Sequence, residues 1–229
     1  MNESIFKQAS TNTSSDSRAQ ASTNVDSLPT LHLPVGGGKI NVAFVMTEDA
    51  TMIDFAGPWE VFQDVGTKEG DQAFRLYTVS DELKSIRATG GMKITPDYTF
   101  KTAPAPQVIV VPAQSGHSEA MMDWLRKSSE TADVTMSVCT GVFQLAKAGL
   151  LDGQRATTHH DSLDYLARMF PKIKVDRKAR FVENNRVSTA AGLTSGIDLA
   201  LRVVERYFGR EKAERVARFM EYHSKAWVA

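Results

Sequence analysis

The chain has 229 residues, of which 42% are hydrophobic and 24% charged, a composition typical of a globular domain with a buried core. Lys plus Arg and Asp plus Glu number 27 each, so the formal net charge is zero, which argues against a nucleic-acid partner. The one cysteine excludes an intrachain disulfide and a Cys-rich metal site, and it suits a reducing compartment.

The first 38 residues differ in composition from the rest of the chain. They are rich in Ser, Thr, Asn, Asp and Gln and end in a run of three glycines. Such a segment buries too little apolar surface to fold, so we interpret 1–38 as a disordered leader and 39–229 as the domain. It lacks the apolar core of a signal peptide, and no stretch is long enough to span a bilayer. A cytoplasmic protein without a membrane partner is expected, and removing 1–38 is expected to leave folding and activity nearly unchanged.

From Lys39 onward, segments with strand-like and helix-like patterns alternate. Strands are predicted at 40–46, 74–80, 107–112 and 134–138, and hairpins at 86–95 and 179–189. Helices are predicted from Gly57-Pro58 onward, over 118–127, 141–147 and 162–169 (the last capped by Asp161), and around 197–208 and 213–220. This order predicts an α/β fold with a mostly parallel sheet covered by helices on both faces.

Cys139 directly follows the strand predicted at 134–138, VTMSV, and precedes Thr140-Gly141 and a helix. Parallel sheets bind ligands at the carboxyl ends of their strands, which is where this pattern places the cysteine. Gly141 would allow a tight turn, and the helix N-terminus would lower the pKa of the thiol. A small, inert core residue is an equally good reading of the position alone.

Longer motifs resemble the ThiJ/PfpI superfamily, which is class I glutamine amidotransferase-like. They read SVCTG at 137–141, AGLLDG at 148–153, RATTH at 155–159, IDFAGPWEVF at 53–62 and AGLTSGIDLA at 191–200. The form is closest to the isonitrile hydratase branch and to the sensor domains of AraC-type regulators. The resemblance implies a flavodoxin-like three-layer α/β/α sandwich with a nucleophile elbow, a small-molecule substrate, no cofactor and a homodimer.

The resemblance also implies the roles of two residues: Cys139 as the nucleophile and Asp54 as the carboxylic acid that faces it. From the residues alone, Asp54 is also a good N-cap for the helix expected at Gly57. Glu48 and Asp49 in the same loop are interpreted as solvated charges, Asp49 also as a turn former.

Further residues are assigned to substrate binding by the same resemblance. They are Thr140, Gly141, Ala113, Gln114 and His159. The pair Ala113-Gln114 stands where the branch usually has a Gly-Gly turn, so the pocket is expected to differ there and Gln114 to offer a new polar contact. Taken alone, a histidine such as His159 is more often structural than a base.

His160 follows His159 directly and stands where the branch commonly has tryptophan. Adjacent side chains on an extended segment point in different directions, so no two-histidine metal site is expected.

Three functions fit these features. The first is an isonitrile hydratase-like lyase that forms a thioimidate on Cys139. The second is a glyoxalase or deglycase-like enzyme acting on α-oxoaldehydes, although such members typically have glutamate in place of Asp54. The third is a ligand or redox sensor related to the regulator domains, which continue into a DNA-binding region for which this chain is expected to leave no room.

Overall fold

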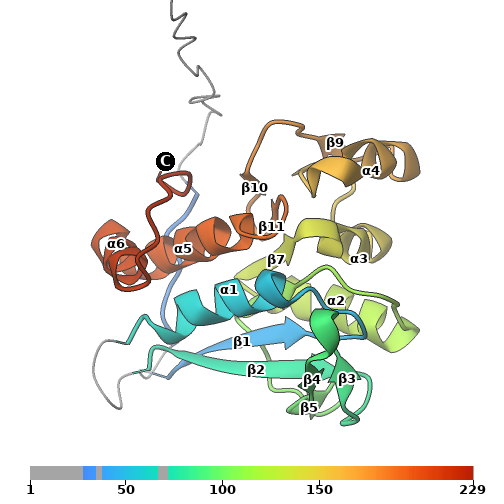
Figure 1. Ribbon diagram of the computed structural model, residues 1–229, viewed down its shortest axis with the longest axis horizontal. Coiled ribbons are helices and arrows are strands. Elements are labelled where there is room, and N and C mark those ends of the chain that lie inside the picture. The colour runs from blue at the N-terminus through green and yellow to red at the C-terminus, as the bar shows by residue number, and fades with distance from the viewer. Residues whose placement is uncertain (1–27, 35–37, 67–71, 229) are drawn as a thin grey trace, which may run out of the picture.

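The computed structural model describes residues 28–34, 38–66 and 72–228 (Figure 1). Within these residues, seven strands form the main sheet in the order β10-β11-β7-β6-β1-β2-β5. Neighbouring strands are parallel except β10 and β11, which form an antiparallel pair at one edge. The strands are β1 (Ile40–Val45), β2 (Phe74–Ser80), β5 (Tyr98–Thr99), β6 (Val108–Val111), β7 (Val134–Val138), β10 (Phe181–Glu183) and β11 (Val187–Ala190). The predicted α/β class with a mostly parallel sheet is confirmed.

Two short strand pairs lie outside this sheet. Strands β3 (Ile86–Arg87) and β4 (Lys93–Ile94) form the small hairpin predicted around the Gly90-Gly91 pair. Strands β8 (Arg155–Ala156) and β9 (Lys174–Val175) pair in parallel beyond the sheet.

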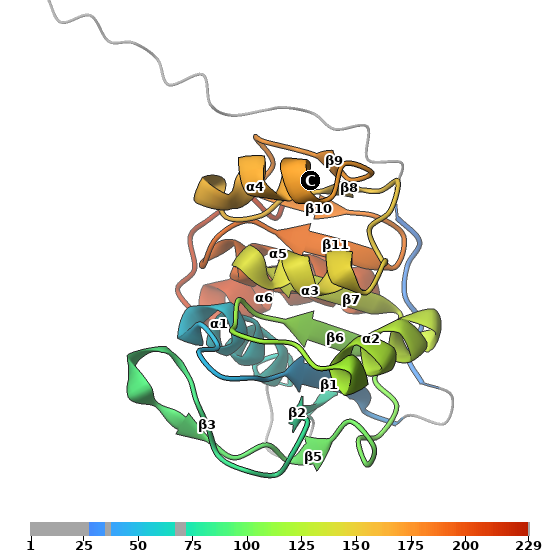
Figure 2. The ribbon, with the colours of Figure 1, turned by 90° about the vertical axis from the view of Figure 1, so that its right-hand side faces the viewer.

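Helices cover both faces of the sheet, and each face has its own apolar core (Figures 1 and 2). One core is shared with α1 (Met52–Gln63), α5 (Ser195–Phe208) and α6 (Arg210–Phe219). The other is shared with α2 (Glu119–Thr131), α3 (Val142–Lys147) and α4 (Leu163–Met169). The central strands β1, β6 and β7 are buried on both faces because helices cover both. β1 and β6 are mostly apolar, whereas β7 alternates apolar residues with the buried Thr135 and Ser137.

The prediction that a helix opens at Gly57-Pro58 is wrong: α1 begins at Met52, and Pro58 lies inside it. Proline favours the first turn of a helix, but here it occupies the second turn and has no N–H to donate to the Asp54 carbonyl four residues earlier. Tight packing accompanies this exception, since a Cβ at Gly196 of α5 would lie 3.4 Å from the Pro58 ring. The earlier start places Asp54 in the first turn of α1.

The expected cap of α4 is also corrected. Its N-cap is Ser162, and Asp161 belongs to a 3-10 turn over His160–Ser162. That turn is capped by His159, whose side chain accepts a hydrogen bond from the Asp161 backbone N–H.

Part of the predicted leader contacts the domain, whereas 1–27 and 35–37 lie outside the described residues. The Leu31 N–H donates to the carbonyl of Arg206 at 2.9 Å, and the Leu31 side chain packs against the core that contains α5. Residues 28–34 are therefore attached to the domain at this point.

We accordingly expect two truncations to differ. Deleting 1–27 keeps these contacts and should leave the melting temperature nearly unchanged. Deleting 1–34 removes the Leu31 contacts, which should cost about 1–2 kcal/mol and lower the melting temperature by roughly 2–6 °C. Thermal unfolding of the two truncated chains tests this, and equal melting temperatures would contradict it.

No helix in the described part of the chain is both long and apolar enough to cross a membrane.

Candidate active site

Four adjacent parallel strands, β11, β7, β6 and β1, bring their carboxyl ends to one edge of the sheet. Cys139 follows β7, Ala113 follows β6 after Pro112, and the turn 191–194 follows β11. Asp54 comes from the first turn of α1, which the chain enters from β1. Segments far apart in the sequence are thus placed together, as the strand-end rule predicts.

Cys139 lies at a strained junction between β7 and α3. Its φ of +57° is in the left-handed region, which costs energy for a residue with a side chain. The Cys139 N–H donates to the Ala191 carbonyl at 2.8 Å, and the Thr158 hydroxyl donates to the Cys139 carbonyl at 2.8 Å. These bonds hold the backbone in this conformation and leave the thiol buried, with 7% of the residue exposed.

Gly141 is required for the close approach of two chain segments. A Cβ at this position would lie 2.2 Å from the Val111 carbonyl oxygen and 2.8 Å from that of Pro112. The elbow therefore packs directly against the end of β6. This contact gives Gly141 a structural role, and its role in substrate binding stays a prediction.

Asp54 is fully buried and points toward this elbow from α1. Its Oδ2 accepts a hydrogen bond from the Ala113 N–H at 3.2 Å, while Oδ1 is buried without a hydrogen-bond partner among the described residues. Thr51, not Asp54, is the N-cap of α1, so the alternative N-cap role is wrong. Burying a carboxyl with an oxygen that makes no hydrogen bond costs free energy of folding.

Burial raises the pKa of Asp54 to about 7, because an ionised carboxylate is poorly solvated inside the protein. Weaker contributions from the Ala113 N–H, the Cys139 side chain and the Leu193 N–H lower the pKa but do not cancel the effect of burial. Asp54 can therefore exchange a proton near neutral pH.

The expected lowering of the thiol pKa is contradicted. Burial and the facing Asp54 carboxylate raise the pKa of Cys139 to about 11, although the Thr140 N–H, the Leu193 N–H and the Thr140 hydroxyl act in the opposite direction. The sequence suggested a helix dipole at the thiol, but a 3-10 turn over Cys139–Gly141 intervenes and α3 has only six residues. Cys139 and Asp54 titrate as one pair, which holds a single proton between about pH 7 and pH 11.

The turn after β6 is fastened to the loop after β1. Gln114 Oε1 accepts from the Thr47 N–H at 2.7 Å, and the Ala113 carbonyl accepts from the Thr51 N–H at 2.8 Å. Gln114 Nε2 is buried and has no partner in the described part of the chain. Because Gln114 Oε1 is already bonded to the Thr47 N–H, only the amide nitrogen of Gln114 can offer the predicted polar contact to a substrate.

His159 stands beside the turn after β11, against Gly192. A Cβ at Gly192 would lie 2.4 Å from the His159 ring, so this glycine makes room for the histidine. His159 Nδ1 accepts from the Asp161 N–H at 3.3 Å. This bond makes His159 a capping residue, the structural role that the sequence left open.

The expectation that His159 and His160 point in different directions is wrong. Their rings lie 4.2 Å apart at 35°, because the segment forms a turn and is not extended. Together with Asp161 they offer possible ligand atoms within 4.8 Å of one another. His159 Nδ1, however, already accepts from the Asp161 N–H, and the Asp161 carboxylate lies 3.6 Å from His159 Nδ1 and 3.1 Å from His160 Nε2.

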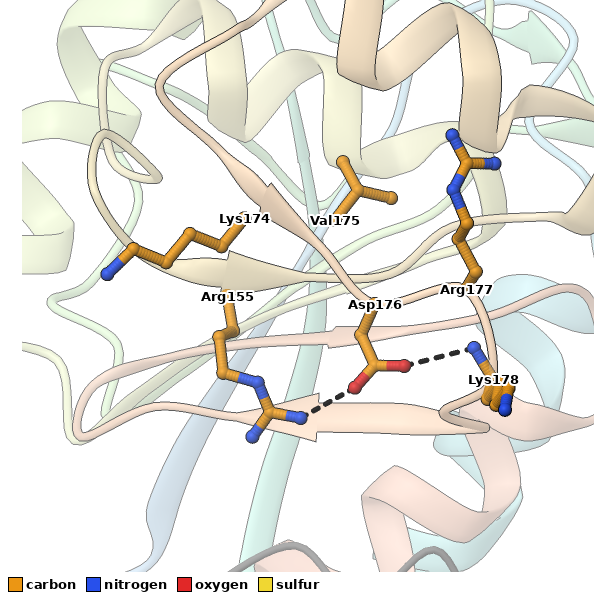
Figure 3. Close-up of a pocket in the computed structure, with 6 residues that line it drawn as sticks. All are labelled: Arg155, Lys174, Val175, Asp176, Arg177 and Lys178. Carbon is orange, nitrogen blue, oxygen red and sulfur yellow. Dashed lines mark hydrogen bonds and ion pairs between the residues drawn. The ribbon is translucent and has the colours of Figure 1, made fainter.

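A basic pocket of about 460 Å³ lies on β8, β9 and the loop after β9 (Figure 3). None of its lining residues is among those predicted for the site. Arg155 pairs with Asp176 at 2.6 Å, while Lys174 and Arg177 extend away from this pair in different directions (Figure 3). The cations do not converge on one point where an anion would sit.

Two contributors were missed by sequence reasoning. Leu193 has a left-handed φ of +55°, and its N–H lowers the pKa of both Cys139 and Asp54; nothing in its residue type signals this. Thr158 supports the elbow through the Cys139 carbonyl, and its place in the 155–159 motif was the available signal.

The fold and site define an α/β sandwich protein with a cysteine at a nucleophile elbow and a facing carboxylic acid. The model of the DJ-1/PfpI family matches residues 40–206, and the chain belongs to this family. Isonitrile hydratase from Pseudomonas putida is 30% identical over 191 residues, which cover 80% of this chain and 78% of that protein. The HTH-type transcriptional regulator GbdR of Pseudomonas aeruginosa is 26% identical, but the match spans half of its length.

Solved structures show the same fold. A ThiJ/PfpI family protein from Pseudomonas syringae superposes with a TM-score of 0.72 at 26% identity, covering 90% of this chain and 82% of that one. Drosophila melanogaster DJ-1beta superposes with a TM-score of 0.71 at 17% identity, covering 82% of this chain and all of that one.

Proposed function

We propose that this protein is an isonitrile hydratase-like lyase, which adds water to an isonitrile to give an N-substituted formamide. The observation that carries the proposal is the buried Asp54–Cys139 pair, which holds one transferable proton near neutral pH. The isonitrile carbon needs both a nucleophile and a proton, and the pair supplies both. The 30% identity to the Pseudomonas putida enzyme supports this substrate class.

In the first step, the sulfur of Cys139 bonds to the isonitrile carbon, and the same carbon receives the proton of the pair by way of Asp54. The product is a thioimidate in which the nitrogen keeps its substituent. The proton reaches carbon through the Asp54 carboxyl, which is buried beside Cys139 and has a pKa of about 7. No metal or organic group takes part in this step.

In the second step, the water oxygen bonds to the thioimidate carbon, and Asp54 takes one proton from the water and passes it to the nitrogen. The carbon–sulfur bond then breaks as the carbonyl forms, and the remaining hydroxyl proton passes by way of Asp54 to the sulfur of Cys139. The sum is one isonitrile and one water converted to one formamide. Asp54 returns to its starting protonation state.

Turnover of a small alkyl isonitrile, followed by formamide formation, tests this function. The wild-type protein should produce formamide, and Cys139→Ser should remain folded and produce none, because its hydroxyl is a far weaker nucleophile. Methylglyoxal, offered to the same preparation, tests the α-oxoaldehyde alternative. Consumption of methylglyoxal with an inert isonitrile would reject the hydratase proposal.

A ligand-sensing role is the second candidate, favoured by the similarity to the regulator GbdR over 80% of this chain. Binding of a small molecule without turnover of either substrate would favour it.

A further inference from the structure

A buried polar network lies behind the turn that faces the active-site cysteine. Asp198, in the first turn of α5, is fully buried and accepts hydrogen bonds from the Arg180 Nε, the Tyr222 hydroxyl and the Ser224 hydroxyl. The partners come from the segment before β10 and from the chain after α6. Three regions that are distant in the sequence therefore meet on one carboxylate.

The same network holds the turn at residue 194. Arg180 Nη2 donates to the Thr194 hydroxyl at 2.9 Å, and the Tyr222 hydroxyl also approaches the Thr194 carbonyl at 3.3 Å. The Arg180 carbonyl accepts from the Ala191 N–H at 2.9 Å. The turn 191–194 is thus hydrogen-bonded at both of its ends, Ala191 and Thr194, by residues outside the Cys139–Asp54 pair.

The other side of this turn faces the active site. The Ala191 carbonyl accepts from the Cys139 N–H at 2.8 Å. Leu193 adopts a left-handed φ of +55°, and its N–H lowers the pKa of both Cys139 and Asp54. A leucine with an exposed side chain gains nothing from this conformation by itself, so the surroundings must impose it.

We propose that Arg180, Asp198 and Tyr222 are positioning residues that hold the turn 191–194, and with it the Ala191 carbonyl and the Leu193 N–H, beside Cys139 and Asp54. The proposal rests on the proposed function for its catalytic consequence, and on the contacts alone for its effect on the thiol. The chain after α6 thereby becomes part of the active-site support, through Tyr222.

Two variants each remove hydrogen bonds that hold the turn 191–194 while leaving the apolar core unchanged. Tyr222→Phe removes the hydroxyl that reaches Thr194 and Asp198, and Thr194→Val removes the acceptor of Arg180 on an exposed side chain. Ser224→Ala is the matched control, because Ser224 bonds to the same carboxylate but to no atom of the turn.

The main measurement is the alkylation rate of Cys139 by iodoacetamide at pH 8–9. Asp54 is the charged group that acts on the thiol, and the other contributors are neutral donors of Thr140 and Leu193. Because the Leu193 N–H lowers the pKa of Cys139, displacing it should slow alkylation, by up to about tenfold for one pKa unit. Ser224→Ala should alkylate at the wild-type rate.

Isonitrile turnover is the second measurement. Both variants should lower kcat by roughly tenfold with little change in KM, less than the 10²–10³ that complete loss of such a donor costs. A wild-type alkylation rate in both folded variants would overturn the proposal. If the wild type does not convert isonitriles but the variants still alkylate slowly, the proposed function fails and the positioning role stands.

Discussion

Asp54→Asn is expected to lower isonitrile turnover by roughly 10²–10⁴-fold, the usual contribution of a general acid–base group. Asparagine keeps the size of the side chain and can accept from the Ala113 N–H as Asp54 does, but it carries no transferable proton. Formamide formation at pH 7–8 measures the effect.

The same variant should leave Cys139 reactive. With the facing negative charge removed, the pKa of Cys139 should fall below about 11, so alkylation at pH 8–9 should become faster, not slower. Faster alkylation together with lost turnover separates a catalytic role from a collapsed site.

Two nearby carboxylates serve as controls. Glu48 and Asp49 are exposed in the loop before α1 and bond to the Arg87 N–H and the Ser115 hydroxyl, respectively. Glu48→Gln and Asp49→Asn keep an acceptor oxygen and should retain near-wild-type turnover. An Asp54→Asn variant as fast as the parent would end the proposed mechanism.

The sheet could be predicted because its signal is local. Apolar runs such as 40–46 and 107–112 are too short for helices and too apolar for exposed strands, and alternation with helices then favours a parallel arrangement. The strand-end rule placed Cys139 on the correct edge for the same reason. The order of the strands, by contrast, depends on packing between distant segments.

The start of α1 could not be predicted, because the proline rule competes with packing. Proline in a first turn is the common case, and the sequence around Gly57-Pro58 matches it. α1 begins five residues before Gly57, at Met52, and its first turns contain the buried residues Asp54 and Phe55. Phe55 packs in the core that α1 shares with α5, and such a contact is visible only in three dimensions. The role of Asp54 as N-cap failed with it.

The thiol pKa was mispredicted for a related reason. The sequence shows that a helix follows Cys139, but it does not show that the thiol is buried or that a carboxylate faces it. Burial and the Asp54 carboxylate raise the pKa of Cys139 by more than the nearby N–H groups lower it. The left-handed conformation of Leu193 was missed for the same reason, since the bonds from Arg180 and Tyr222 to the neighbouring Thr194 join segments distant in the sequence. The homodimer expected from the family resemblance stays a prediction.

Asp54→Asn is also expected to stabilise the folded protein above neutral pH. Below pH 3.8 the carboxyl is protonated in both the folded and the unfolded chain. Between about 3.8 and 7 only the unfolded chain ionises, so rising pH favours unfolding, and above 7 the cost is constant. A pKa raised from 3.8 to about 7 corresponds to a loss of about 4 kcal/mol in the free energy of unfolding.

Asparagine removes this cost because it does not ionise. Its amide must still find acceptors in a buried site, so the net gain at pH 8 should be smaller, roughly 2–4 kcal/mol, or about 5–10 °C in melting temperature. At pH 4, where Asp54 is largely protonated in the folded protein, the gain should nearly vanish. Chemical or thermal unfolding of wild type and variant at the two pH values measures the difference, and the exposed Glu48→Gln should show none. An equal shift at pH 4 and pH 8 would mean that the charge of Asp54 carries no folding cost, and the site would then lack the desolvated carboxyl on which the proton transfer depends.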